Sequence, residues 1–205
     1  MLFRSEINSL HPIQWTVYGF DLSSTAIDIL RNDVRYQQAL KLNRTYCDVC
    51  DISISNVLPS YVQSVANVTS LIFCLSAIHP TKHSIVMENV ISTLQPGHGI
   101  LIFRDYGRYD LAQIKLGTQR SKLLDIDNFY RKHDGTKCYY FTIEDIEQLV
   151  RQQNGALEIV ELRYIRRKYI NRSMQCERRR VWVQGRFRRT MHSIETHMSQ
   201  SGNNN

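Results

Sequence analysis

The chain has 205 residues, which is enough for one domain with a sizeable core and too few for two domains of ordinary size. Hydrophobic residues make up 42% and charged residues 22%, which excludes a wholly disordered chain. The longest dense apolar stretch, 71–78, is too short to cross a bilayer, and the N-terminal residues lack the apolar region of a signal peptide. We therefore expect a globular protein without a membrane span.

In the first half of the chain, the hydrophobic pattern predicts strands at 16–20, 45–49, 68–75 and 99–103, with helices at 22–32 and 82–94. The strand at 68–75 is almost continuously apolar, as expected for a strand that is buried on both faces of a parallel sheet. Strands and helices that alternate in this way predict an α/β fold with a parallel sheet.

In the second half, residues 118–138 are polar and rich in turn formers. A capping box at Thr142–Asp145 predicts a helix to about Gln153. Two β-like segments, 157–165 and 180–187, are expected to close the sheet as an antiparallel, hairpin-like edge. Residues 190–205 have the composition of a disordered polar tail.

The five cysteines are odd in number and irregularly spaced, which favours a reducing compartment over a disulfide framework. We expect the cytoplasm, with the mitochondrion and the nucleus left open. Cys47 and Cys50 form a CxxC, but a structural zinc ion needs a second pair and a redox motif needs a helix after it. The sequence therefore predicts no metal site, and a structural role for the isolated His79.

The positive charge is concentrated near the C-terminus. The whole chain has a net charge of +7. The stretch 161–190 holds eleven Lys and Arg against two acidic residues, a balance of +9, so the rest of the chain is at −2. Aromatic residues interleave with these cations, among them Tyr164, Tyr169, Trp182 and Phe187. This pattern indicates a polyanionic partner such as RNA, while a solvated basic surface is the alternative.

Polar residues follow the predicted strands, where ligands bind in open α/β sheets. Asp21 ends the first strand and precedes a helix, so it is either a ribose-binding acid or a helix N-cap, and Asp48 allows the same two interpretations. The densest polar cluster is Phe103–Asp110, with two arginines, two aspartates and two tyrosines. It is either a structural Arg–Asp network or a reaction site.

Four long strings resemble the tRNA N3-methylcytidine methyltransferases, a methyltransferase-like family. They are FRDYGRYDLAQ (103–113), NFYRKHDGTKCYYFT (128–142), LIFCLSAIHP (71–80) and RRRVWVQGRFRR (178–189). The similarity runs from about residue 16 to 189, and it implies a Rossmann-like class I methyltransferase domain over 1–189.

The resemblance implies that the cofactor is S-adenosylmethionine (SAM) and the substrate is tRNA, with an aminoacyl-tRNA synthetase as a further partner for some members. The expected cofactor contacts are Asp21, Asp48, Val49 and Ile72. The expected catalytic residues are Asp105, Arg104 and Asp110, with a carboxylate beside the cytosine ring that becomes cationic on N3 methylation. The expected RNA contacts are Tyr106, Arg108, Phe129, Tyr130, Arg178 and Arg180.

One departure from the family pattern concerns the glycine-rich turn that lets the backbone approach the cofactor. No residue before Asp21 supplies it, because the first glycine, Gly19, falls inside a predicted strand. We therefore expect the first strand and its turn to be missing, the Asp21 strand to lack a neighbour, and activity to be impaired. The alternatives are an inactive module that binds RNA or a partner, and a methyltransferase for a protein or small molecule.

Overall fold

The computed structural model describes residues 15–171 and 176–191. They fold into two compact units, one up to Asp51 and one from Ile52 onward. Within the described residues, no helix is long and apolar enough to span a membrane.

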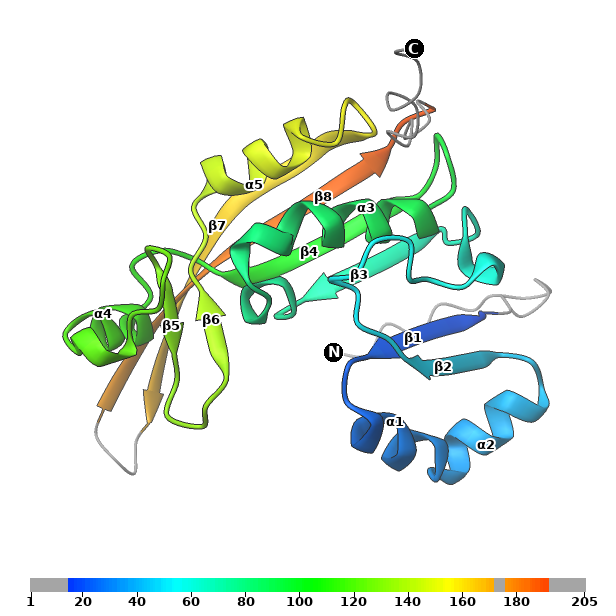
Figure 1. The fold of residues 1–205 in the computed structure, drawn as a ribbon, viewed down its shortest axis with the longest axis horizontal. Coiled ribbons are helices and arrows are strands. Elements are labelled where there is room, and N and C mark those ends of the chain that lie inside the picture. The colour runs from blue at the N-terminus through cyan, green and yellow to red at the C-terminus, as the bar shows by residue number, and fades with distance from the viewer. Residues whose placement is uncertain (1–14, 172–175, 192–205) are drawn as a thin grey trace, which may run out of the picture. The chain divides into compact units, whose positions relative to one another are not determined.

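The first unit consists of two parallel strands joined by two helices (Figure 1). Strand β1 (Val17–Asp21) pairs with β2 (Thr45–Val49), and helices α1 (Ser24–Arg31) and α2 (Val34–Lys41) lie between them in the sequence. Ser23 caps α1, because its side chain accepts the Ala26 backbone N–H. Helix α2 was not predicted, because its polar sequence VRYQQALK buries only Tyr36.

The outer edge of β1 has no strand partner among the described residues, where β1 pairs with β2 alone. Val17 and Tyr18 on this strand are exposed. One edge of β1 is therefore unpaired within the described residues.

The second unit is built on a four-stranded sheet in the order β3-β4-β8-β7. Strands β3 (Val68–Ile72) and β4 (Ile100–Tyr106) are parallel, while β8 (Cys176–Arg189) and β7 (Leu157–Asn171) add an antiparallel hairpin, as predicted. Helices α3 (His83–Thr93) and α5 (Ile143–Arg151) lie against one face (Figure 1). Thr142 and Asp145 form the predicted capping box of α5. The core joins both layers through residues that include Phe103, Phe187, Val86, Ile91, Ile146 and Val150.

Strand β3 differs from its prediction in length and burial. It ends at Ile72, because Phe73 takes a left-handed backbone conformation (φ 52°) before a short 3-10 helix, Leu75–Ala77. The expected burial on both faces is wrong: Leu71 is buried, but Val68 and Ile72 are about half exposed. The physical reason is that β3 pairs only with β4 in the described residues and is packed on one face.

A smaller layer lies beyond the carboxyl end of β4 (Figure 1). It contains α4 (Leu111–Gly117), a 3-10 turn at 120–122, and the paired strands β5 (Phe129–Arg131) and β6 (Lys137–Tyr139). Further 3-10 turns, outside this layer, lie at 60–62 before β3 and at 80–82 before α3. The layer's own small core includes Tyr130, Cys138 and Tyr140. The sequence pattern predicted only turns over most of this segment.

The β7–β8 hairpin is longer than predicted and extends past β4 (Figure 1). Strand β4 pairs with β8 only from Arg188 to Trp182, whereas β7 and β8 pair to their ends. We name the part beyond Trp182, residues 166–171 and 176–181, the arm. Its side chains at 166–170 and 177–179 are all exposed.

Candidate functional site

Consecutive residues at the end of β4 point to opposite faces of the sheet. Asp105 pairs with Val183 and faces the side covered by the helices, where it has no exposed surface. Arg104 and Tyr106 lie on the other face, opposite Gln184 and Trp182, and both are half-buried. We call this side the open face. The predicted Arg-Asp-Tyr motif is therefore divided between the two sides of the sheet.

Asp105 joins the ends of β3 and β4. Its Oδ2 accepts the Ser76 backbone N–H at 2.9 Å, and its Oδ1 accepts its neighbour's N–H, that of Tyr106, at 2.8 Å. Burial raises the pKa of this carboxyl group, while these hydrogen bonds act in the opposite direction. Cys138, which is also fully buried, has its thiol pKa raised by burial to about 11. Asp105 thus holds the strand end in place from inside the core.

The open face at the end of β4 collects aromatic rings and cations. The Arg104 guanidinium donates to the Gln184 side-chain oxygen and lies 5.4 Å from the centre of the Trp182 ring. The Phe73 ring contacts both Tyr106 and Trp182, with ring centres 5.0 and 5.8 Å apart. Trp182 Nε1 is buried and has no hydrogen-bond partner among the residues that the structure describes. Sequence reasoning missed Phe73 and Gln184, because only the strand register brings them to Arg104.

Two further cations lie near Tyr106. Lys132 Nζ is 5.0 Å and the Arg180 guanidinium 5.4 Å from the centre of its ring. Such contacts between a cation and an aromatic face are attractive. They link the end of β4 to the smaller layer, which contains Lys132, and to Arg180 near the inner end of the arm.

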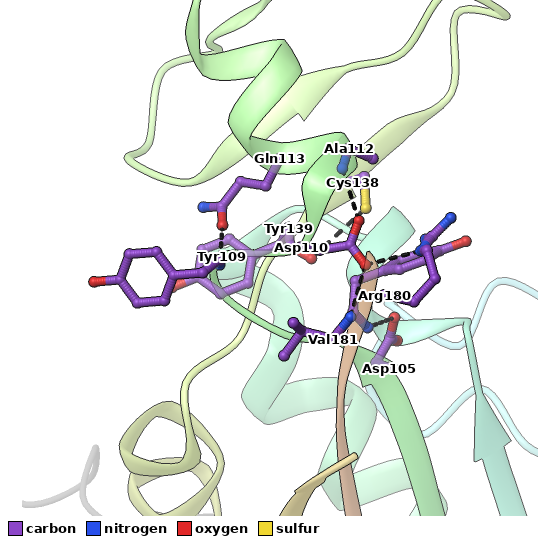
Figure 2. Close-up of polar contacts among 10 residues, drawn as sticks. Asp105, Tyr109, Asp110, Ala112, Gln113, Cys138, Tyr139, Arg180 and Val181 are labelled. Atoms are coloured by element: carbon purple, nitrogen blue, oxygen red, sulfur yellow. Dashed lines mark hydrogen bonds and ion pairs between the residues drawn. The ribbon is translucent and has the colours of Figure 1, made fainter. Parts of the chain in front are cut away.

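Asp110 is a structural junction, shown in Figure 2. Its buried carboxylate accepts the Ala112 N–H at 2.8 Å and so caps α4. The other oxygen accepts Arg180 Nε at 2.8 Å and the Val181 N–H at 2.9 Å. A buried carboxylate with three donors is fully satisfied. The structural Arg–Asp network left open by the sequence is therefore present.

On the arm, cross-strand pairs share a face, so the open face continues outward. It carries Arg180 opposite Arg167 and Arg178 opposite Tyr169, with no acidic residue among them. The other face carries Lys168 and Arg179, which both pair with Glu177 at 2.6 Å. Arg167 and Arg178 on the open face therefore keep more of their charge available to a partner, whereas Arg180 is paired with Asp110.

Phe129 and Tyr130, two of the expected RNA contacts, are less exposed than that role suggests. Phe129 is fully buried against His79, and Tyr130 is buried in the small core. Arg108 is half-buried and donates from Nε to the Tyr140 carbonyl at 3.2 Å. Both rings are therefore covered in the structure, Tyr130 within the core of the smaller layer and Phe129 beside His79. RNA contact by these residues stays a prediction.

The cofactor residues expected in the first unit lie at the carboxyl ends of its two strands. Asp21 Oδ1 accepts the Ser23 N–H at 2.8 Å, and its second oxygen has no hydrogen-bond partner among the described residues. Asp48 pairs with Arg31 at 3.0 Å and accepts the Val49 N–H at 2.9 Å, while the Val49 side chain is exposed. A free carboxylate oxygen and an exposed apolar side chain fit a nucleoside. The helix cap is Ser23 and not Asp21.

In the second unit, the exposed Ile72 ends β3 and offers an apolar contact. The described residues contain no glycine-rich turn before Asp21, since Gly19 lies within β1. They also contain no group of three His, Cys, Asp or Glu side chains arranged to hold a metal ion. His79 Nδ1 accepts the Thr81 backbone N–H, and its Nε2 lies 3.0 Å from Asp125 Oδ2.

Comparison with curated proteins finds close relatives, although no protein-family model matches. A tRNA N(3)-methylcytidine methyltransferase of Drosophila melanogaster is 36% identical over 178 residues, which cover 87% of this chain and 52% of the fly protein. The tRNA N(3)-methylcytidine methyltransferase of Schizosaccharomyces pombe is 30% identical over 84% of this chain and 53% of its own length. A protein of Dictyostelium discoideum named O-methyltransferase 3 is 32% identical over 87% of this chain and 39% of its own length.

The chain therefore spans about half the length of the curated tRNA methyltransferases it matches. Solved structures share its fold. A SAM-dependent methyltransferase of Methanosarcina mazei aligns with a TM-score of 0.60 at 16% identity, over 87% of this chain and 84% of that one. A methyltransferase of Bacillus halodurans aligns with a TM-score of 0.55 at 10% identity, over 85% and 83% of the two chains. The predicted class I, Rossmann-like α/β fold is confirmed, and so is the resemblance to the tRNA N3-methylcytidine methyltransferases.

Proposed function

This chain is a relative of the tRNA N3-methylcytidine methyltransferases, and from that premise we propose a function. We propose that it contains the residues that contact the cofactor and the RNA in such an enzyme. The reaction would transfer a methyl group from SAM to N3 of cytidine in tRNA. The observation that carries the proposal is the open face of β4 and β8. Aromatic rings and cations lie along it from the end of β4 to the basic arm.

The proposal treats residues 1–189 as parts of one methyltransferase domain, within which it assigns Asp21, Asp48, Val49 and Ile72 to the cofactor. Their exposed positions at the ends of parallel strands support the assignment. When bound, SAM supplies an electrophilic methyl group on a sulfonium centre. The side chains would bind and orient, because N3 of cytosine is already a nucleophile and needs no covalent intermediate on the protein.

For the β4 residues, burial suggests how each would act. Arg104 and Tyr106, which lie on the open face, would contact RNA directly. Asp105 would act through the N–H groups of Ser76 and Tyr106 that it holds, and through its charge. Asp110 would act by fixing Arg180. The catalytic roles of these residues remain predictions.

The arm supports the choice of RNA as the substrate class. Arg167, Arg178 and Arg180 share the open face with Tyr169, which combines charge for phosphates with a ring for bases. The cytoplasm remains the proposed compartment, supported by the number and spacing of the cysteines. An aminoacyl-tRNA synthetase remains the proposed further partner, supported by the resemblance alone.

The experiment that tests the proposal is titration calorimetry of the purified chain with SAM and its demethylated product, followed by nucleoside analysis of treated tRNA. Micromolar SAM binding and the appearance of N3-methylcytidine would support it. Retained tRNA binding by a folded chain that binds no SAM would instead identify an RNA-binding relative without activity. A methylated small molecule or protein, with unmodified tRNA, would exclude the tRNA substrate.

A further inference from the structure

Tyr109 combines an unfavourable backbone conformation with high exposure. Its φ is 64°, in the left-handed region, and 78% of the residue is exposed to solvent. Bulky side chains rarely adopt this conformation, which glycine and asparagine tolerate. Core packing therefore does not explain why a tyrosine stands here.

The loop around Tyr109 is held firmly on both sides. Before it, the Gly107 N–H donates to the Val181 carbonyl at 2.9 Å, and the Arg108 N–H donates to the Phe141 carbonyl at 2.8 Å. A Cβ atom on Gly107 would lie 3.0 Å from the Val181 side chain, so glycine allows the close approach to β8. The backbone that enters Tyr109 is thus fixed by two other segments.

After it, the buried Asp110 carboxylate anchors the chain to Arg180 and to the N-terminus of α4. The Tyr109 N–H itself donates to Gln113 Oε1 at 2.7 Å, and the amide nitrogen of Gln113 donates to Asn128 Oδ1 at 3.1 Å. Figure 2 shows Asp110 pointing into this network while the Tyr109 ring points away from it. Such a strained conformation persists only where the surroundings fix it, and it is typical of functional sites.

We infer that Tyr109 is a stacking contact for an unpaired base of the RNA substrate, a role that rests on the proposed function. Its neighbourhood favours RNA as the occupant: Arg108 precedes it in the chain, and the network that fixes it ends in Arg180, a cation near the inner end of the arm. A base of any kind offers a flat face to such a ring, whereas paired bases are already stacked and inaccessible.

The test compares wild type, Tyr109→Gly and Tyr109→Phe of the full chain for binding to single-stranded oligocytidylate and to a fully paired RNA duplex. Loss of one stacked base weakens binding by about 5- to 100-fold, so Tyr109→Gly should bind the single strand that much more weakly. Its duplex affinity and the salt dependence of binding should stay unchanged, and Tyr109→Phe should bind both RNAs as wild type does.

The melting temperature separates this role from a structural one. Because glycine relieves the left-handed strain, Tyr109→Gly should melt at or above the temperature of wild type, and Asn154→Gly (φ 50°) serves as a control for the same backbone change elsewhere. Equal single-strand binding by wild type and Tyr109→Gly would overturn the inference alone. A wild-type chain that binds neither RNA would overturn the proposed RNA substrate and this inference together.

Discussion

The inner half of the β7–β8 hairpin, beside β4, and the arm beyond it have the same alternation of side chains but differ in burial. Where β8 lies beside β4, alternate side chains such as Val183 and Phe187 are fully buried in the core. In the arm, the side chains at 166–170 and 177–179 are exposed on both faces, and basic residues predominate. The difference arises because only the inner half pairs with a third strand, β4, and is covered by helices.

The arginines show what this difference means. Arg189, in the inner half, is buried and donates to the Leu94 carbonyl near the end of α3. Arg180, at the boundary, is fixed by Asp110. Arg167 and Arg178, in the arm, have no ion-pair partner among the described residues. Arginines of one hairpin thus range from structural groups to charges available for a partner.

The largest loss of stability is expected for Asp110→Ala. It removes the cap of α4 and leaves the Arg180 guanidinium and the Val181 N–H without their acceptor, which costs about 3 to 5 kcal/mol. Urea denaturation measures the change. The matched control is Glu158→Ala, which removes an exposed partner of another β8 arginine, Arg188, and should cost at most about 0.5 kcal/mol. Equal losses for both variants would remove the distinction between the buried and exposed pairs.

A pH-dependent loss of stability is expected from a buried histidine of the core, His83. Burial lowers the pKa of His83 from its ordinary 6.5 to about 4, so the unfolded chain binds a proton at a higher pH than the folded chain does. The contribution of His83 to the free energy of unfolding is therefore fully present above pH 6.5, and it falls by about 3 kcal/mol as the pH drops to 4. The difference in unfolding free energy between wild type and His83→Asn, measured from pH 4 to 7, should shrink on acidification. A constant difference would contradict the buried neutral state.

A smaller loss is expected for Arg189→Met. The substitution keeps apolar bulk but removes donors to Ser64 Oγ at 3.2 Å and to the Leu94 carbonyl, which costs about 2 kcal/mol. Arg188→Met, one position earlier and exposed, should change stability by less than about 0.5 kcal/mol. Thermal unfolding of both variants tests this. If Arg188→Met were the more destabilising of the two, the assignment of Arg189 as the buried, structural arginine would be wrong.

The sequence predicted what depends on local pattern and missed what depends on pairing. Periodicity located β2 at its observed bounds, and the capping box located α5. It could not show that Asp105 turns into the core while Arg104 does not, because this depends on the register with β8. Nor could it show that Phe129 is buried or that Tyr109 is exposed, since tertiary contacts decide both. The basic stretch was evident from composition, but its extension into an arm follows from where β4 ends.

The most direct test of the central claim, that the open face of the arm contacts RNA, is the salt dependence of tRNA affinity. Arg167→Gln/Arg178→Gln should fold with wild-type stability and show a log–log salt slope that is shallower by about 1.4 to 1.8, as expected for two lost phosphate contacts. Arg186→Gln/Arg188→Gln removes the same charge from exposed positions on the inner half of β8 and should keep the wild-type slope. Equal changes in slope for both double variants would show that only total charge matters, and would contradict a specific role for the arm.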